Sequence, residues 1–159
     1  MKITILAVGK VKEQYYNEAI AEYSKRLGRY CTLEIIEVDD EKTPDGASEK
    51  EEVKIRDKEG ERLSRFIPDD AYVVALAIGG KEMSSVEFAE GIEGLGVDGV
   101  SHIVFIIGGS IGLSEDILGG ADARLSFSRM TYPHQLMRVI LLEQIYRAFR
   151  INRGEPYHK

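Results

Sequence analysis

Short apolar runs alternate along this chain with longer stretches in which apolar residues recur every three or four positions. The runs at 71–78 and His102–Ile107 are continuous, which is typical of strands covered on both faces. Strands are predicted at Lys2–Val8, Thr32–Val38, 71–78, His102–Ile107 and 124–127, and helices at 13–29, 48–65, 84–93, a short stretch after Ser114, and 133–152. Because strands and helices alternate, we expect one α/β domain over residues 1–159, with a mostly parallel sheet flanked by helices.

The last predicted helix, 133–152, carries apolar side chains around most of its circumference. These are Leu136, Met137, Val139, Ile140, Leu141, Leu142, Ile145, Tyr146, Ala148 and Phe149. One face of a sheet cannot bury all of them, and a second copy across a two-fold axis is the simplest additional partner surface. We therefore expect a homodimer.

The net charge of −6 hides an asymmetry. Residues 124–159 carry seven basic and two acidic side chains, a balance of +5, so residues 1–123 carry −11. Local Arg and Lys density is what holds phosphates, so the C-terminal quarter is the candidate polyanion surface, with an ordinary solvated helix face as the alternative. Residues 39–65 contain ten acidic and seven basic side chains, and we interpret their helix as a solvated face rather than a mobile lid.

Several classes are disfavoured by what the chain lacks. The longest apolar runs fall far short of the roughly 20 residues of a membrane span, and the single cysteine, Cys31, is compatible with a reducing compartment. We expect a cytoplasmic protein. The three histidines, His102, His134 and His158, show no metal-ligand spacing, so no metal is expected. His134 follows Pro133 at a predicted helix start, where it either caps the helix or lines a pocket.

The sequence Gly108-Gly109-Ser110-Ile111-Gly112 lies between a predicted strand and a predicted helix, where ligands of open α/β sheets bind. It lacks the spacing of a dinucleotide fingerprint or a P-loop. It fits the G-x-S-x-G elbow of serine hydrolases, with Ser110 as nucleophile and Asp122 and His134 or His158 following. Only 47 residues remain after Gly112 to carry such partners. A tight turn without a ligand is the remaining alternative.

Three C-terminal segments are more specific: SFSRMTYPHQLMR at 126–138, LEQIYRA at 142–148 and GEPYHK at 154–159. With Gly108-Gly109-Ser110 and the opening KITILAVGK at 2–10, they closely resemble the ribosomal RNA pseudouridine N3-methyltransferases of the SPOUT, or α/β-knot, superfamily. The resemblance covers essentially the whole chain. It implies a C-terminal trefoil knot, a rare exception to unknotted topology, and a homodimer.

The resemblance also implies a cofactor and a site. S-adenosylmethionine would be held by three loops that match Leu76, Gly108 and the segment 127–132, in which Leu76 covers the adenine and backbone groups hydrogen-bond it. The cofactor-binding residues implied are Leu76, Gly108, Phe127, Ser128, Arg129, Met130, Thr131 and Tyr132.

The implied substrate is a pseudouridine of large-subunit (23S) ribosomal RNA, methylated at N3 within assembled ribosomes. Because N3 is a poor nucleophile until its proton is lost, the enzyme must supply alignment and either a base or groups that stabilise the anion. Our hypothesis is that His158 and Tyr157 orient or deprotonate the pseudouridine ring. Arg147, Arg129 or Arg138 would hold a phosphate or the developing imide anion.

The tail that carries His158 and Tyr157 is of a kind that is commonly disordered. Ordering over RNA, across the dimer interface, would reconcile such a tail with a catalytic role. A non-catalytic ribosome-binding factor with the same fold is the third alternative, and cofactor binding separates it from the enzyme.

Overall fold

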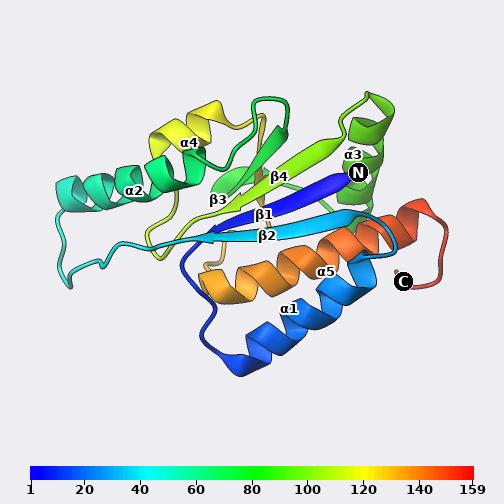
Figure 1. Cartoon of the computed structure of the whole chain (residues 1–159), viewed down its shortest axis with the longest axis horizontal. Helices are drawn as coiled ribbons and strands as arrows, with labels where there is room; N and C mark the ends of the chain where they lie inside the picture. The colour runs from blue at the N-terminus through cyan, green and yellow to red at the C-terminus, as the bar shows by residue number, and fades with distance from the viewer.

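Five parallel strands form the central sheet of the computed structural model, which describes residues 1–159 (Figure 1). The strands are β1 (Lys2–Val8), β2 (Thr32–Val38), β3 (Tyr72–Glu82), β4 (His102–Ile107) and β5 (Ala123–Ser126). Their order is β2-β1-β4-β3-β5, and every neighbouring pair is parallel. The predicted α/β fold with a parallel sheet flanked by helices is confirmed.

Five helices cover the two faces of this sheet (Figure 1). They are α1 (Gln14–Leu27), α2 (Glu49–Ser64), α3 (Ser85–Val97), α4 (Glu115–Gly120) and α5 (His134–Asn152). Helices α1, α3 and α5 pack on one face, with α5 in contact with both others, and α2 and α4 pack on the other. Successive strand residues serve opposite faces: Ile103 and Phe105 join the first core and Val104 the second. No helix is long and apolar enough to span a membrane.

Helix α3 extends to Val97, beyond the predicted end near residue 93, and includes Gly94 and Gly96, which we expected in a loop. Each glycine costs a helix only about 1 kcal/mol relative to alanine. Ile92 is buried and Leu95 packs against the same core, so the apolar face of the helix continues through the glycines. Tertiary packing therefore outweighs local propensity here.

The polar helix α2 is a packed element with a solvated outer face. Leu63 is fully buried, and Gly60 allows close approach to α4, because a Cβ at Gly60 would lie 2.5 Å from Oγ of Ser114. Ser48 caps the helix by accepting a hydrogen bond from the backbone N–H of Glu51.

Strand β3 continues to Glu82, past the predicted end at residue 78, and its register with β5 shifts on the way. Both Leu76 and Lys81 pair with Leu125, so the intervening residues make an excursion beside β5. Gly80 passes so close that a Cβ there would lie 2.8 Å from backbone atoms of Arg124 and Leu125. This close passage gathers the chain after Leu76 and the chain after Leu125 at one end of the sheet.

Candidate functional site

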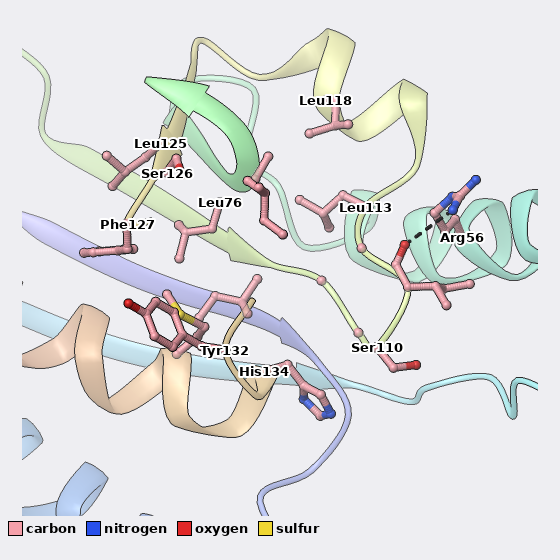
Figure 2. A pocket seen from close by; sticks show the side chains of 18 of the residues that line it. Arg56, Leu76, Ser110, Leu113, Leu118, Leu125, Ser126, Phe127, Tyr132 and His134 are labelled. Atoms are coloured by element: carbon pink, nitrogen blue, oxygen red, sulfur yellow. Dashed lines mark hydrogen bonds between the residues drawn. The ribbon is translucent and has the colours of Figure 1, made fainter. Parts of the chain in front are cut away.

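A cavity of about 580 Å³ opens at the carboxyl ends of β3, β4 and β5 (Figure 2). It is lined by Arg56, Leu76, Ala77, Ile78, Ile107, Gly108, Gly109, Ser110, Ile111, Gly112, Leu113, Glu115, Leu118, Leu125, Ser126, Phe127, Ser128, Met130, Tyr132, His134 and Met137. Its volume lies in the range of small-molecule sites, and it occupies the position where open α/β sheets bind ligands.

The glycine turn after β4 forms one wall of the cavity. The N–H of Gly112 donates to the carbonyl of Gly109 at 3.1 Å, and Gly112 has a φ of +84°, which favours glycine. A Cβ at Gly108 would lie 2.8 Å from the carbonyl carbon of Gly112 and 3.1 Å from the side chain of Leu113. The turn is therefore closed so tightly that Gly108 has no room for a side chain, and backbone rather than side chain faces the cavity there.

Apolar side chains form the opposing walls. Figure 2 shows Leu76, Leu125 and Phe127 on one side and Leu113 and Leu118 on the other. A flat, largely apolar group such as a purine would be covered on both faces between such walls.

Two serines shape the chain that leaves β5 along the cavity. Oγ of Ser126 donates to the carbonyl of Ser128 at 3.0 Å, and Oγ of Ser128 accepts from the N–H of Met130 at 2.9 Å. These local bonds hold the loop curled against the cavity, with the remaining backbone groups of the loop free to meet a ligand.

Two of the lining side chains are charged. Nη1 of Arg56, from α2, donates to the carbonyl of Ile111 at 3.4 Å, as the dashed line in Figure 2 shows. Glu115, at the start of α4, also lines the cavity. A ligand with an apolar ring and a charged end fits this division.

Six of the eight predicted cofactor residues line this one cavity. They are Leu76, Gly108, Phe127, Ser128, Met130 and Tyr132. Arg129 and Thr131 have exposed side chains and are not among the lining residues. Their contact with the cofactor stays a prediction.

The three predicted catalytic residues also come together, at the other end of α5. Arg147 pairs with Glu143 at 2.6 Å, and its Nη1 lies 3.2 Å from Nδ1 of His158. The hydroxyl of Tyr157 donates to Oε1 of Glu143 at 3.1 Å, and its ring lies under the Arg147 guanidinium. Burial and this hydrogen bond to Glu143 raise the pKa of Tyr157 to about 12, so the phenol stays protonated. The tail is packed rather than extended into solvent.

Arg138, one of the three predicted anion-holding arginines, forms its contacts within the fold. Its side chain is buried, donates to the carbonyls of Val8 and Gly9 at 3.1 and 2.6 Å, and pairs with Glu37. It therefore satisfies the carboxyl end of β1 and ties α5 to the sheet. The expectation that Arg138 is free to hold a ligand anion is corrected.

His134 was predicted either to cap α5 or to line a pocket. It lines the cavity and makes no capping hydrogen bond. Its Nδ1 is buried without a hydrogen-bond partner. Burial first, and the nearby Arg138 guanidinium second, hold the pKa of His134 below its usual range. The imidazole is therefore neutral at physiological pH.

The serine hydrolase alternative lacks its geometry. Ser110 lines the cavity, but no histidine is hydrogen-bonded to it. Asp122 lies before β5, at the amino end of that strand, where its Oδ2 accepts from the backbone N–H of Val73 at 2.7 Å. His158 contacts Arg147 at the far end of α5. These groups do not assemble into a triad.

Sequence reasoning missed several residues that line the cavity. Arg56 lies in a helix whose pattern suggested only a solvated face, and Leu113, Leu118 and Met137 read as ordinary core positions. Ile78, which was also missed, lines the cavity although it is 53% exposed. A large exposed apolar side chain beside a cavity is a signal that only the structure provides.

A buried carboxyl group supports the glycine turn from behind. Glu59 is 4% exposed, its Oε2 accepts from the N–H of Glu41 at 3.0 Å, and its Oε1 is buried without a partner. A Cβ at Gly109 would lie 3.3 Å from the same carboxyl group. Burial raises the pKa of Glu59, although the Glu41 N–H opposes the shift.

The raised pKa of Glu59 gives a testable pH dependence. Because the folded state favours the protonated carboxyl, the stability that Glu59 contributes is present below its unfolded pKa and is lost as pH rises through the folded pKa. Urea unfolding of wild type and Glu59→Gln between pH 4 and 8 should show wild type losing free energy of unfolding relative to the variant as pH rises. Glu61→Gln is the control, because Glu61 is exposed on the same helix. If the difference in free energy of unfolding between wild type and Glu59→Gln changes with pH no more than the difference between wild type and Glu61→Gln, the interpretation is contradicted.

The fold and the cavity together define an α/β protein with a cavity at the carboxyl ends of its strands, the position where open α/β sheets bind ligands. Comparison with known families gives the next step. The model for the family described as "Predicted SPOUT methyltransferase" matches residues 1–158, and the chain belongs to this family. The resemblance seen in the sequence is confirmed.

Individual relatives match over the whole chain. The chain is 65% identical over 159 residues to a protein of Bifidobacterium adolescentis named "Ribosomal RNA large subunit methyltransferase H", with full coverage of both chains. It is 60% identical, again over both full lengths, to proteins of the same name from Clostridium beijerinckii and Clostridium novyi.

A solved structure supports the fold alone. A probable methylase family protein from Haemophilus influenzae Rd KW20 superposes with a TM-score of 0.56 at 14% identity, covering 99% of this chain and 70% of that one.

Proposed function

We propose that this protein uses S-adenosylmethionine to methylate N3 of a pseudouridine in large-subunit ribosomal RNA, within assembled ribosomes and as a homodimer. The observation that carries the proposal is the cavity closed by the Gly108 turn, in a chain that matches the ribosomal RNA methyltransferases along its full length. The relatives' name supports ribosomal RNA as the substrate, and the cavity supports a cofactor site at the Gly108 turn.

The residues of the cavity fit this cofactor. Leu76, Leu125 and Phe127 offer an apolar surface for adenine, and the backbone of the Gly108 turn and of the loop after β5 offers hydrogen-bonding groups. Arg56 and Glu115 have the charges that the carboxylate and amino groups of the methionine part require. When bound, the sulfonium supplies an electrophilic methyl group and a positive charge next to the acceptor nitrogen.

The transfer forms an N–C bond at N3 and breaks the S–C bond, whose electron pair stays on sulfur, while the N3 proton leaves to water. What the protein must add is alignment and stabilisation of the imide anion. Arginine can only donate hydrogen bonds, so in this contact Nδ1 of His158 accepts from Arg147, and Nε2 is the ring nitrogen that would carry the proton. His158 is thereby oriented to donate to an oxygen next to N3, and Glu143 fixes both Arg147 and Tyr157.

The distance between the cavity and the tail supports a dimer. His134 lines the cavity at the start of α5, and Arg147 lies thirteen residues later, about 20 Å along the helix axis. Within one protomer the tail and the cavity therefore lie at opposite ends of α5. A second copy with its α5 antiparallel to the first would bring the tail of each protomer to the cavity of the other. Leu136 and Ile140, only partly covered in the single chain, would be buried there.

The excursion of β3 beside β5 supports a knot. Leu125 is flanked by Leu76 and Lys81 of one continuous strand segment, with Gly80 against its backbone. A chain that passes through such an excursion and then continues into α5 is the arrangement expected for the trefoil knot of this superfamily.

Methyl transfer to ribosomes tests the proposal. The purified protein is incubated with radiolabelled S-adenosylmethionine and bacterial ribosomes that lack the modification, and the RNA is digested for mass spectrometry. We expect label in large-subunit RNA and a pseudouridine that carries the methyl group on N3. Absence of both S-adenosylhomocysteine binding and methyl transfer would instead support the non-catalytic ribosome-binding factor.

A further inference from the structure

Arginine and tyrosine side chains gather where the C-terminal ends of α1 and α5 meet the chain terminus. Cation–π contacts occur about once per 70 to 80 residues in proteins, so about two are expected in a chain of this length. Six are present, all in this region, and they pair Arg26, Arg29, Arg147, Arg150 and Arg153 with Tyr23, Tyr30, Tyr146 and Tyr157. The guanidinium groups of this region therefore lie against aromatic rings.

Tyr30 is the fixed centre of this surface. It is 9% exposed, and its ring stacks on Phe149 with centroids 5.6 Å apart and planes at 15°. Its hydroxyl donates to Oε2 of Glu155 at 2.6 Å and accepts from Nη1 of Arg150 at 3.3 Å. Tyr30, three residues after the end of α1, is thereby bound to α5 and to the tail.

Two arginines at Tyr30 have no acidic partner. The Cζ atoms of Arg29 and Arg153 lie 5.7 and 4.7 Å from the Tyr30 centroid, and both side chains are exposed. By contrast, Arg26, Arg147 and Arg150 each pair with a glutamate. Stacking occupies the face of a guanidinium and leaves its N–H donors free to meet an anion.

This arginine pair adjoins the tail that carries the predicted catalytic residues. Glu155 binds both Tyr30 and Arg150, and Nη2 of Arg150 donates to the carbonyl of Pro156 at 3.0 Å. Tyr157 and His158 follow directly. Figure 1 shows the tail folding back beside the ends of α1 and α5.

The charge of the region points to a polyanion. Seven basic residues and three acidic ones give +4 in a protein whose net charge is −6: Lys25, Arg26, Arg29, Arg147, Arg150, Arg153 and Lys159 against Glu22, Glu143 and Glu155. A planar guanidinium matches a phosphate bidentately. We propose that Arg29 and Arg153, held on Tyr30, contact phosphates of the RNA backbone beside the target nucleotide. This inference rests on the proposed function, because it takes ribosomal RNA as the substrate.

The test compares the double variant Arg29→Ala/Arg153→Ala with Lys50→Ala/Lys54→Ala, two exposed cations of α2 without ion pairs. Binding to ribosomes and to protein-free large-subunit RNA is measured between 50 and 200 mM KCl. We expect the arginine variant to bind about tenfold more weakly, with a slope of log K against log salt that is smaller by about 1.5. KM for ribosomes should rise, whereas kcat should stay within about twofold of the wild-type value. The affinity for S-adenosylhomocysteine should not change. Arg29→Lys/Arg153→Lys, which keeps the charge, should keep most of the salt slope.

Three results for the Arg29→Ala/Arg153→Ala variant would overturn the inference. They are binding as strong as that of the lysine control, weaker binding to ribosomes but not to the free RNA, or a smaller mass than the wild type by light scattering. The second would mean that a ribosomal protein is the partner, and the third that the surface joins two copies of the chain. Binding is measured without turnover, so absence of methyl transfer by the wild type would instead overturn the proposed function.

Discussion

His158→Ala is expected to lower methyl transfer to ribosomes by about 10³-fold, because loss of one preorganised donor to a developing anion typically costs 10²- to 10³-fold. Affinity for S-adenosylhomocysteine should stay within about twofold, since His158 lies at the opposite end of α5 from the cavity. Single-turnover methylation and calorimetric titration measure the two quantities. Unchanged turnover at saturating cofactor would remove His158 from the catalytic set.

A matched variant separates the donor role of His158 from that of a base. Glutamine places an amide N–H near the position of the imidazole Nε2 and cannot accept the N3 proton. If Nε2 donates, as the contact with Arg147 indicates, His158→Gln should retain activity within about tenfold of wild type. Activity as low as that of the alanine variant would favour a base.

Mixed dimers test where the tail acts. A subunit with His158→Ala supplies an intact cavity, and one with Gly108→Trp supplies an intact tail. Random pairing makes about half of the dimers mixed, and one of their two sites is complete only if the tail crosses to the partner. About one quarter of wild-type activity should then return, whereas a tail acting within its own protomer would restore none.

The sheet and most of the cavity wall were predictable because they rest on local signals. Continuous apolar runs identified β3 and β4, and the glycines at 108–112 marked the turn after β4. The resemblance placed Leu76 and the loop 127–132, and six of the eight residues share the cavity. Each of these depends on a short stretch whose own composition fixes its conformation or its motif.

The remaining features depend on pairs of segments that are distant in sequence. The excursion of β3 beside β5 joins Lys81 to Leu125, and no pattern within either segment indicates it. The continuation of α3 through Gly94 follows from packing of Leu95 on the core. Arg138 read as a free cation, but its burial under β1 becomes evident only when α5 is docked on the sheet. Tertiary packing decided all three.

Gly108→Ala is expected to weaken S-adenosylhomocysteine binding by at least about 100-fold. The new Cβ would lie 2.8 Å from the carbonyl carbon of Gly112 and 2.9 Å from its oxygen, so the backbone of the turn must move. That backbone lines the cavity, and a site whose hydrogen-bonding groups shift by tenths of an ångström loses its preorganised contacts. Calorimetric titration of S-adenosylhomocysteine measures the loss.

Gly79→Ala is the matched control for this variant. Gly79 lies in the β3 excursion next to the cavity residue Ile78, but a Cβ there meets nothing within 4 Å. It should therefore bind S-adenosylhomocysteine as the wild type does. If Gly108→Ala keeps its circular dichroism spectrum and cooperative unfolding while binding is lost, the closed turn is what the cofactor requires. Wild-type binding by Gly108→Ala would mean that the cofactor lies elsewhere in the cavity, away from the turn.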